Sequence, residues 1–360
     1  MSANKLVLVI GATGAQGMAV VDALLAPSDD VLQSPYAVRA LTRDPESRRA
    51  KELSARGVEV VKGAFNNFPS VIAAMQGTYG VFVNTDGFTV GEEREIYAGI
   101  RIYELAKQVP TIRHYVWSNL DYIAKIVDYN PEYRCEHQDG KGRVGEFLKL
   151  QLSDPTESGF VWSQLTTTPY MDMLQSIMFG PLNKRDDGTV VFATPVGQGH
   201  VPMIALSDLG FFARYIFDHR TETSGQDLRV TSDIVGWDYL IETYQKVTGD
   251  KAVVVHQTID EWFNNFENAD VPLANDIWRQ GTATTETTTW RKNFTAWWKM
   301  WRDDILHFDI DWIRKLNPDG HTLETWMRDK DYIGMAEHHL LKNVEDGHMI
   351  RPRKEIVSGL

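Results

Sequence analysis

Three glycines near the start of the chain are spaced as in a turn that binds a diphosphate. The turn reads Gly11-Ala12-Thr13-Gly14-Ala15-Gln16-Gly17. In such a turn the first glycine bends the chain, the second lets backbone N–H groups approach a pyrophosphate, and the third lets a helix pack close to a strand. Because the helix N-terminus then faces the phosphates, we expect this turn, with Thr13, Ala15 and Gln16, to bind a dinucleotide. A glycine-rich structural turn is the alternative.

A second group with chemical potential is the pair His137 and Lys141. Their spacing of four residues puts both side chains on one face of a helix. An imidazole can donate or accept a proton near neutral pH, so His137 is a candidate for proton transfer. The alternative is a structural histidine that caps the helix or lines the cofactor.

The elements around these residues alternate between strand and helix. Residues 6–10 form a continuous aliphatic run, which is typical of a strand buried on both faces, and residues 18–25 favour a helix. We expect strands at 6–10, 36–42, 58–62, 81–84, 114–118 and 160–165, and helices at 18–25, 47–56, 69–75, 92–107 and 142–150. This order predicts an α/β fold with a doubly wound, parallel Rossmann sheet. In such sheets the ligand lies beyond the carboxyl ends of the strands.

The end of the second expected strand bears on the choice of dinucleotide. An acidic residue there accepts a hydrogen bond from the ribose 2′-hydroxyl of NAD, whereas an arginine pairs with the 2′-phosphate of NADP. The chain reads Thr42-Arg43-Asp44. We take Arg43 as the phosphate ligand, which favours NADP(H). Asp44 leaves two alternatives open, because it could serve NAD or begin the next helix.

The pattern changes after Pro169, where the chain leaves the sixth expected strand. Eight of the eleven tryptophans lie between Trp262 and Trp326, and strand signals are scarce there. We expect residues 1–168 to form the dinucleotide-binding domain, with residues 200–235 returning to it. Residues 169–199 and 236–360 would form a smaller, mainly helical and tryptophan-rich lobe that binds the substrate.

Composition excludes several classes of protein. The net charge of −12 argues against a nucleic-acid surface, which needs a basic stripe, and against an anionic membrane. The chain has 43% hydrophobic and 24% charged residues, which is typical of a globular protein. Its single cysteine, Cys135, cannot form an internal disulfide, which fits a reducing compartment. With no run of about 18 apolar residues, we expect a cytoplasmic protein.

No histidine stands at a spacing typical of metal ligands. His338 and His339 are adjacent, which would point them apart on a helix, and no H-E-x-x-H segment is present. The sequence therefore predicts no metal site.

Taken together, several segments resemble the NmrA-like family of atypical short-chain dehydrogenases. The resemblance covers about residues 4–250 and rests on the segments 11–17, 38–45, 81–85, 95–107, 115–120, 137–141 and 201–210. Beyond them only residues 321–326 look similar to the family. The resemblance implies a Rossmann fold and an NAD(P) cofactor, and the family includes both reductases and redox sensors.

The resemblance also implies further cofactor contacts. Asn84 and Thr85 correspond to the loop beside the nicotinamide, and Pro169 to the segment that covers it. The acidic residue that the family usually carries after the third strand is missing, because the chain reads Gly63-Ala64-Phe65-Asn66-Asn67. We expect Phe65 and Asn66 to contact the adenine in its place.

Short-chain dehydrogenases use a Tyr-x-x-x-Lys pair, in which the lysine holds the nicotinamide ribose and the tyrosine transfers the proton. By this resemblance Lys141 is the ribose ligand and His137 stands at the tyrosine position. Tyr170, which follows the sixth expected strand, is a second candidate for the proton donor, or else a wall of the site.

Candidate substrate residues follow from the same topology. Asn119 and Asp121 come at the end of the fifth expected strand and could orient a substrate or cap the next turn. Trp297, Trp298 and Trp301 lie on one helical face. They either form the core of the lobe or, as we propose for Trp298, line a pocket for a flat aromatic compound.

These observations give two hypotheses of function. The first is an NADP(H)-dependent oxidoreductase that transfers a hydride to a carbonyl, imine or enone of a bulky aromatic or alkaloid-like metabolite. The resemblance includes reductases of fungal natural-product pathways, some of which couple reduction to ring formation, so a reduction coupled to cyclisation is a further form of this hypothesis. The second is a redox sensor that binds dinucleotide and docks onto a protein partner. Either could be a monomer or a homodimer.

Overall fold

The computed structural model describes residues 4–27, 33–334 and 350–360. The chain divides into two compact units. The first comprises residues 1–122, 136–167 and 209–230, and the second comprises residues 123–135, 168–208 and 231–360. The adjacent histidines 338 and 339, weighed above as metal ligands, lie outside the described residues.

The first unit contains a seven-stranded parallel sheet with the order β10-β6-β5-β4-β1-β2-β3. The strands are β1 (Lys5–Ile10), β2 (Tyr36–Thr42), β3 (Glu59–Lys62), β4 (Gly80–Val83), β5 (His114–Asn119), β6 (Val161–Thr166) and β10 (Asp227–Arg229). The strands β4, β5 and β6 are buried along their whole length, although β5 and β6 also carry polar residues such as Ser163 and Gln164. The predicted doubly wound parallel sheet is confirmed.

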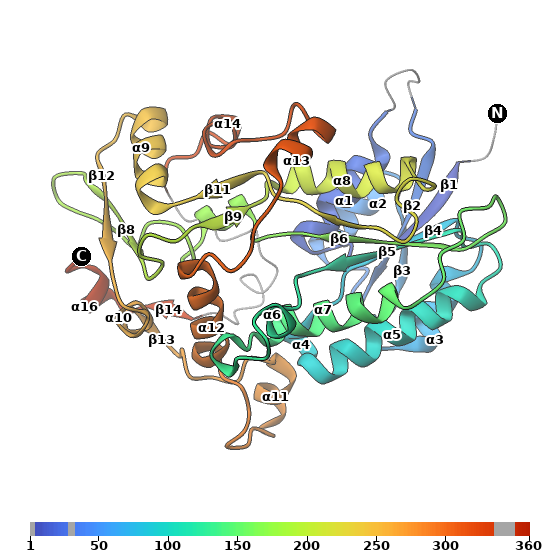
Figure 1. Ribbon diagram of the computed structural model, residues 1–360, viewed down its shortest axis with the longest axis horizontal. Helices are drawn as coiled ribbons and strands as arrows, with labels where there is room; N and C mark the ends of the chain where they lie inside the picture. Colours follow the sequence, from blue (N-terminus) through green and yellow to red (C-terminus); the bar gives the residue numbers. More distant parts are fainter. Residues whose placement is uncertain (1–3, 28–32, 335–349) are drawn as a thin grey trace. The chain divides into compact units, whose positions relative to one another are not determined.

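Helices cover both faces of this sheet. They are α1 (Ala15–Leu25), α2 (Arg48–Ala55), α3 (Phe68–Met75), α4 (Gly87–Val90), α5 (Glu92–Gln108), α7 (Glu136–Lys149) and α8 (Leu206–Asp218). Figure 1 shows α3, α5 and α7 on one face, with α1 and α8 on the other. Gly210 of α8 approaches α1 so closely that an added Cβ would lie 2.6 Å from the Ala19 carbonyl oxygen.

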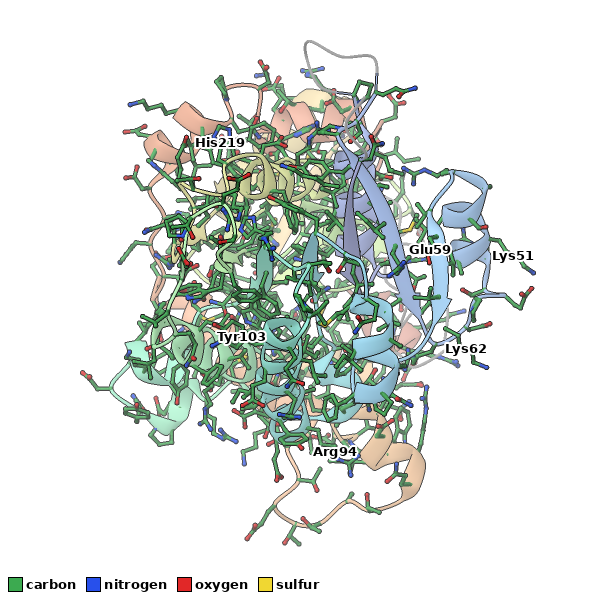
Figure 2. The ribbon with its side chains drawn as sticks, turned by 90° about the vertical axis from the view of Figure 1, so that its right-hand side faces the viewer. Lys51, Glu59, Lys62, Arg94, Tyr103 and His219 are labelled. Carbon is green, nitrogen blue, oxygen red and sulfur yellow. The ribbon has the colours of Figure 1, made fainter. Side chains whose placement is uncertain are left out.

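The edge strand β3 carries exposed charges. Figure 2 shows Lys51, Glu59 and Lys62 at this edge of the first unit, and the Glu59 carboxylate pairs with the Arg39 guanidinium at 2.9 Å. Charged side chains at a sheet edge disfavour pairing with another chain.

Helix α7 begins at Glu136, six residues before the expected start at residue 142. Its first two turns are polar and glycine-rich and therefore lack an apolar stripe. Nevertheless Gln138, Asp139 and Lys141 are buried there. The early start places His137 and Lys141 on one helix.

The second unit combines short strands with helices. Its sheets are β12-β8-β7, β11-β9 and β13-β14. The strands are β7 (Asn183–Lys184), β8 (Val190–Thr194), β9 (Val201–Met203), β11 (Asp233–Val235), β12 (Ala252–His256), β13 (Phe266–Glu267) and β14 (Arg351–Pro352). Most of these strands have two or three residues. That length is too short for the alternation of apolar and polar residues typical of a strand to be recognised in the sequence.

The helical elements of the second unit lie mostly in its later part. They are α6 (Ile123–Ile126), η1 (Pro131–Tyr133), η2 (Met171–Gln175), α9 (Trp237–Thr248), α10 (Ile259–Asn264), α11 (Asn275–Gln280), α12 (Trp290–Arg302), α13 (Ile310–Leu316), α14 (Leu323–Asp329) and α16 (Lys354–Val357). Among the described residues, no helix is both long and apolar enough to cross a membrane.

The units differ from the expected domain boundaries at residues 123–135, 200–208 and 231–235, and by the single residue Thr168. Residues 123–135 belong to the second unit, where Tyr133 donates a hydrogen bond of 2.7 Å to Asp303 beyond α12. Residues 200–208 also belong to it, since β9 pairs with β11. Both links connect residues far apart in the sequence, so no local pattern could indicate them.

Candidate functional site

The glycine turn between β1 and α1 has no room for side chains at two of its three glycines. Gly11 has a φ of +83°, and a Cβ added there would lie 2.6 Å from the Asn84 carbonyl oxygen. A Cβ on Gly17 would lie 2.1 Å from the Gly11 carbonyl oxygen. Gly14 is the N-cap residue of α1, and no side chain caps the helix. The first N–H groups of α1 therefore remain available to a ligand, as a pyrophosphate site requires.

Side chains from outside the turn hold it in place. Gln16 is buried, and its Oε1 accepts a hydrogen bond of 2.7 Å from Ser118 Oγ at the end of β5. The Arg49 guanidinium of α2 is buried and donates to the Thr13 carbonyl oxygen at 3.0 Å. Sequence reasoning missed Arg49, whose neighbours Arg48 and Lys51 are exposed. Its burial depends on the distant turn.

Arg43 and Asp44 take different roles after β2. The Arg43 side chain is exposed, and within the described part of the chain no hydrogen bond or ion pair engages it. The Asp44 carboxylate instead accepts the Glu46 backbone N–H at 2.9 Å. This contact corresponds to the alternative in which Asp44 begins the next helix.

The expected adenine contacts lie after β3. Phe65 is half-buried and packs against the apolar core under the sheet, whereas Asn66 is exposed. Ala15, in the first turn of α1, is half-buried.

Lys141 is the centre of a buried polar network at the carboxyl end of β4. Its ammonium donates to the Thr85 carbonyl oxygen at 2.9 Å, to Thr85 Oγ1 at 3.1 Å and to Asn84 Oδ1 at 3.3 Å. It also lies 3.1 Å from the Glu95 carboxylate, which is completely buried. The Trp117 ring lies beneath it, with 5.3 Å between Nζ and the ring centroid.

Glu95 is, with Arg49, a residue of the candidate site that sequence reasoning missed. It lies in the first turn of α5, where an acidic residue suits the helix dipole and gives no sign of burial. Its partner Lys141 comes from α7, so only the packing of the two helices reveals the pair.

His137 lies one turn before Lys141 on α7. Its half-buried ring packs on Phe88 of α4, with centroids 5.0 Å apart and an angle of 33° between the planes. An aromatic contact of this kind orients the imidazole beside the loop that follows β4.

Asn119 and Asp121, expected as substrate residues, form internal contacts of the first unit. Asn119 accepts from Trp117 Nε1 at 3.1 Å and donates to Thr166 Oγ1 at 2.9 Å. The Asp121 carboxylate receives two hydrogen bonds from the Arg229 guanidinium, at 3.0 and 3.1 Å. These contacts tie β5 to β6 and β10.

Pro169 and Tyr170 belong to the second unit. Their backbone pairs with Ile204, whose N–H donates to the Pro169 carbonyl oxygen at 2.9 Å. Burial, with a smaller contribution from the Asp172 carboxylate, raises the pKa of Tyr170 to about 12. The phenol is therefore a weaker acid than an ordinary tyrosine, which makes proton donation from it harder.

Trp298 is fully buried inside an aromatic cluster of the second unit. Its ring centroid lies 4.9 Å from those of Trp262 and Trp297, 5.9 Å from Phe179 and 6.3 Å from Trp237. This position corresponds to the core-packing alternative for the tryptophans of α12.

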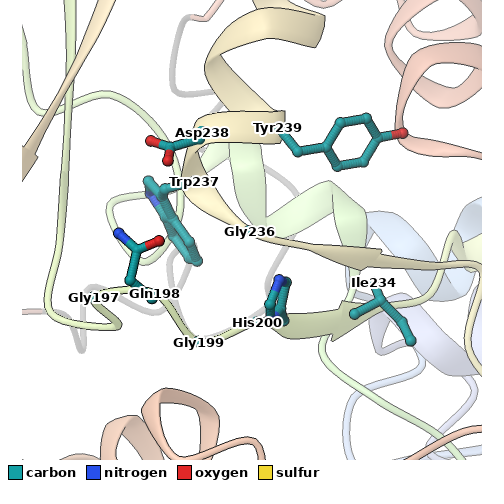
Figure 3. A pocket seen from close by; sticks show the side chains of 9 residues that line it. All are labelled: Gly197, Gln198, Gly199, His200, Ile234, Gly236, Trp237, Asp238 and Tyr239. Atoms are coloured by element: carbon teal, nitrogen blue, oxygen red, sulfur yellow. The ribbon is translucent and has the colours of Figure 1, made fainter.

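The second unit also contains a pocket of about 280 Å³ (Figure 3). Its walls include His200, Trp237 and Tyr239. His200 is oriented by Asp304, whose carboxylate lies 3.2 Å from the ring Nδ1. Among the described residues, no group of three or more His, Cys, Asp or Glu side chains could hold a metal ion.

Comparison with known proteins identifies relatives along most of the chain. A model described as the NmrA-like family matches residues 3–316. The NmrA-like family domain-containing oxidoreductase notA of Aspergillus sp. (strain MF297-2) is 37% identical over 278 residues, or 73% of this chain and 78% of that protein. The corresponding oxidoreductase malD of Malbranchea aurantiaca is 28% identical over 289 residues, or 75% and 78% of the two chains.

Two solved structures share the fold. NmrA, a negative transcriptional regulator, in complex with NAD has a TM-score of 0.69 at 18% identity, over 91% of this chain and 95% of that one. The NADPH-dependent quinone oxidoreductase of Escherichia coli complexed with NADPH has a TM-score of 0.64 at 16% identity, over 90% and 99%.

Proposed function

The chain belongs to the NmrA-like family, and on this premise we propose that it is an NADP(H)-dependent oxidoreductase. The observation that carries the proposal is the link between the glycine turn and Lys141. Asn84 lies against Gly11 through its carbonyl oxygen and binds the Lys141 ammonium through its side chain. One loop thus joins the diphosphate site to the lysine proposed to bind the nicotinamide ribose.

The residues present fit the dinucleotide. The uncapped N-terminus of α1 would hold the pyrophosphate, and the exposed guanidinium of Arg43 would pair with the 2′-phosphate. Phe65 and Asn66 would lie at the adenine, and Pro169 at the nicotinamide. NADP(H), when bound, supplies or accepts the hydride.

Two side chains are proposed for the proton. An imidazole can in general exchange a proton near neutral pH, and the ring of His137 packs on Phe88. Tyr170 carries a phenol proton, although burial raises its pKa to about 12 and so makes it the weaker candidate. Lys141 contributes a fixed positive charge near the loop at Thr85.

For the substrate we propose a flat aromatic or alkaloid-like molecule with a carbonyl, imine or enone group. The pocket of the second unit offers aromatic contacts from Trp237 and Tyr239 together with polar ones from Gln198, His200 and Asp238. Trp298 packs against Trp237 within the aromatic cluster. Ring closure after reduction is a finer form of the same proposal, and product analysis tests it.

The first experiment is a parallel calorimetric titration of the protein with NADPH, NADP⁺, NADH and NAD⁺. Tight binding of the phosphorylated forms is expected. NADPH oxidation is then followed with aromatic ketones, cyclic imines and enones. Substitutions His137→Gln and Tyr170→Phe should reduce turnover while NADPH affinity stays the same. If both variants turn over like the parent protein, the proton assignment is wrong.

A redox sensor is the second candidate, and one observation favours it. Asn119, Asp121 and Gln16, all at the ligand end of the sheet, have their polar groups engaged by the protein itself. A sensor must bind the dinucleotide, but it does not need free polar groups that could bind a substrate. Equal affinity for NAD⁺ and NADP⁺, weak binding of the reduced forms and no turnover would favour this function.

A further inference from the structure

The buried carboxylate of Glu95 is only partly satisfied by its surroundings. Its Oε1 accepts a hydrogen bond of 2.7 Å from Thr85 Oγ1 and lies 3.1 Å from Lys141 Nζ. Its Oε2 is also buried, and among the described residues it has no hydrogen-bond partner. A buried carboxylate with an unpaired oxygen is costly, so the pairing with Lys141 is what makes this position tolerable.

Two glycines leave space for this carboxylate. A Cβ added to Gly87 would lie 2.3 Å from Glu95 Oε2, and one added to Gly140 would lie 3.2 Å from the same atom. Gly87 begins α4 and Gly140 directly precedes Lys141 on α7. The two helices therefore close around the carboxylate, and the backbone next to Lys141 is fitted to it.

The Lys141 ammonium has more acceptors than protons. Three N–H groups face four oxygen atoms, namely the carbonyl and hydroxyl of Thr85, Asn84 Oδ1 and Glu95 Oε1. The longest of these distances is the 3.3 Å to Asn84. A ribose hydroxyl can gain a hydrogen bond from Lys141 only if one acceptor is given up, and Asn84 is the weakest.

We propose that Glu95 is a positioning residue, which fixes the charged Lys141 side chain so that its one exchangeable hydrogen bond, now made to Asn84, passes to the nicotinamide ribose. The inference rests on the proposed function in one respect, namely that Lys141 binds that ribose. Glu95 itself touches no substrate or cofactor in this scheme. Its carboxylate acts only through the lysine.

Two ligands separate positioning from general damage to the fold. NADPH contains the nicotinamide ribose, whereas adenosine 2′,5′-bisphosphate contains only the adenosine half. Glu95→Gln keeps the shape of the side chain and removes its charge. We expect this variant to bind NADPH about tenfold more weakly, as for the loss of one charged hydrogen bond, with unchanged affinity for the bisphosphate. Both affinities are measured by fluorescence or calorimetric titration, without turnover.

A compensating pair of substitutions provides the second readout. Lys141→Met leaves the Glu95 charge buried and unpaired, so its thermal midpoint should fall. In Glu95→Gln combined with Lys141→Met the charge is gone, so the midpoint should rise again. Glu95→Asp, which keeps the charge on a shorter side chain, should recover part of the NADPH affinity lost in Glu95→Gln.

The outcomes separate a failure of the proposed function from a failure of the positioning role of Glu95. If Lys141→Met binds NADPH normally, Lys141 is not a ribose ligand and that part of the proposed function fails. If Lys141→Met weakens NADPH binding but Glu95→Gln does not, the positioning role is refuted and the proposed function stands. If Glu95→Gln lowers the affinity for NADPH and for the bisphosphate equally, the proposal is also overturned, because Glu95 would then have a merely structural role.

Discussion

The glycine turn permits a test that separates folding from ligand binding, through Gly14→Ala and Gly17→Ala. At Gly17 the new Cβ would lie 2.1 Å from the Gly11 carbonyl oxygen and 2.6 Å from Ala12 Cα. Both are backbone atoms and cannot rotate away. At Gly14 the nearest atom is the Gly11 carbonyl oxygen at 3.3 Å, and the φ of −80° suits any residue.

The expected magnitudes follow from these distances. Overpacking of a rigid site costs about 1–3 kcal/mol or more, so Gly17→Ala should lower the free energy of unfolding by at least this amount. Gly14→Ala should cost about 1 kcal/mol, since alanine is a poor N-cap residue. Its methyl group would stand where the pyrophosphate must approach the backbone. We therefore expect NADPH affinity to fall by about 10–100-fold, or roughly 1.4–2.8 kcal/mol.

Urea unfolding and NADPH titration measure the two effects on the same samples. Gly57→Ala is the control, because Gly57 has a φ of +82° and nothing within 4 Å of an added Cβ. It should show a small loss of stability from backbone strain and unchanged affinity. Gly14→Ala with the affinity of the parent protein would refute the pyrophosphate assignment. Gly17→Ala with unchanged stability would refute the packing argument.

Three further predictions concern charge and pH. Arg43→Ala should weaken NADPH binding about tenfold and leave NADH binding unchanged, as parallel titrations would detect; equal losses would contradict a role for Arg43 at the 2′-phosphate. Burial lowers the pKa of His114 to about 3, so the unfolded state takes up more protons below pH 6.5. Stability should therefore fall by about 2 kcal/mol between pH 6.5 and pH 5, a decline in the urea midpoint that His114→Asn should flatten. The hydrogen bond to Asp208, followed by smaller contributions from Asp329, raises the pKa of His321. This contribution to the free energy of unfolding is fully present below pH 6.5 and is lost as pH rises through the folded-state pKa of His321. His321→Gln should therefore reduce the loss of stability measured as pH is raised above 6.5.

The sheet could be predicted from the sequence because its signals are local. A strand buried on both faces needs a run of apolar residues, and Val81, Phe82 and Val83 meet that need without reference to any other segment. The glycine turn is equally local, since its strand, its turn and its helix are consecutive. The spacing of Lys141 from His137 suits one helix face, but the polar, glycine-rich start of α7 carries no apolar stripe, so the helix itself was expected only from residue 142.

The remaining features depend on contacts between distant segments. Glu95 and Lys141 are 46 positions apart, and nothing in its own helix distinguishes Glu95 from an ordinary surface residue. The same holds for Arg49, whose guanidinium is buried against the Thr13 carbonyl oxygen. Trp298 is buried together with Trp297 and Trp301, but the helical spacing of these residues cannot distinguish a core from a pocket wall.

The distinction between an enzyme and a sensor depends on which polar groups at the ligand end of the sheet can still exchange partners. Asn119 and Asp121 are fixed between strands, so rearranging them would disturb the sheet itself. Lys141 differs, because its four acceptors exceed its three protons and one contact can be lost without leaving the ammonium unpaired. A lysine held in this way can bind a ribose in either kind of protein. Binding of the ribose by Lys141 therefore does not separate the two functions. Turnover does, and the responses of His137 and Tyr170 to substitution then identify the proton donor.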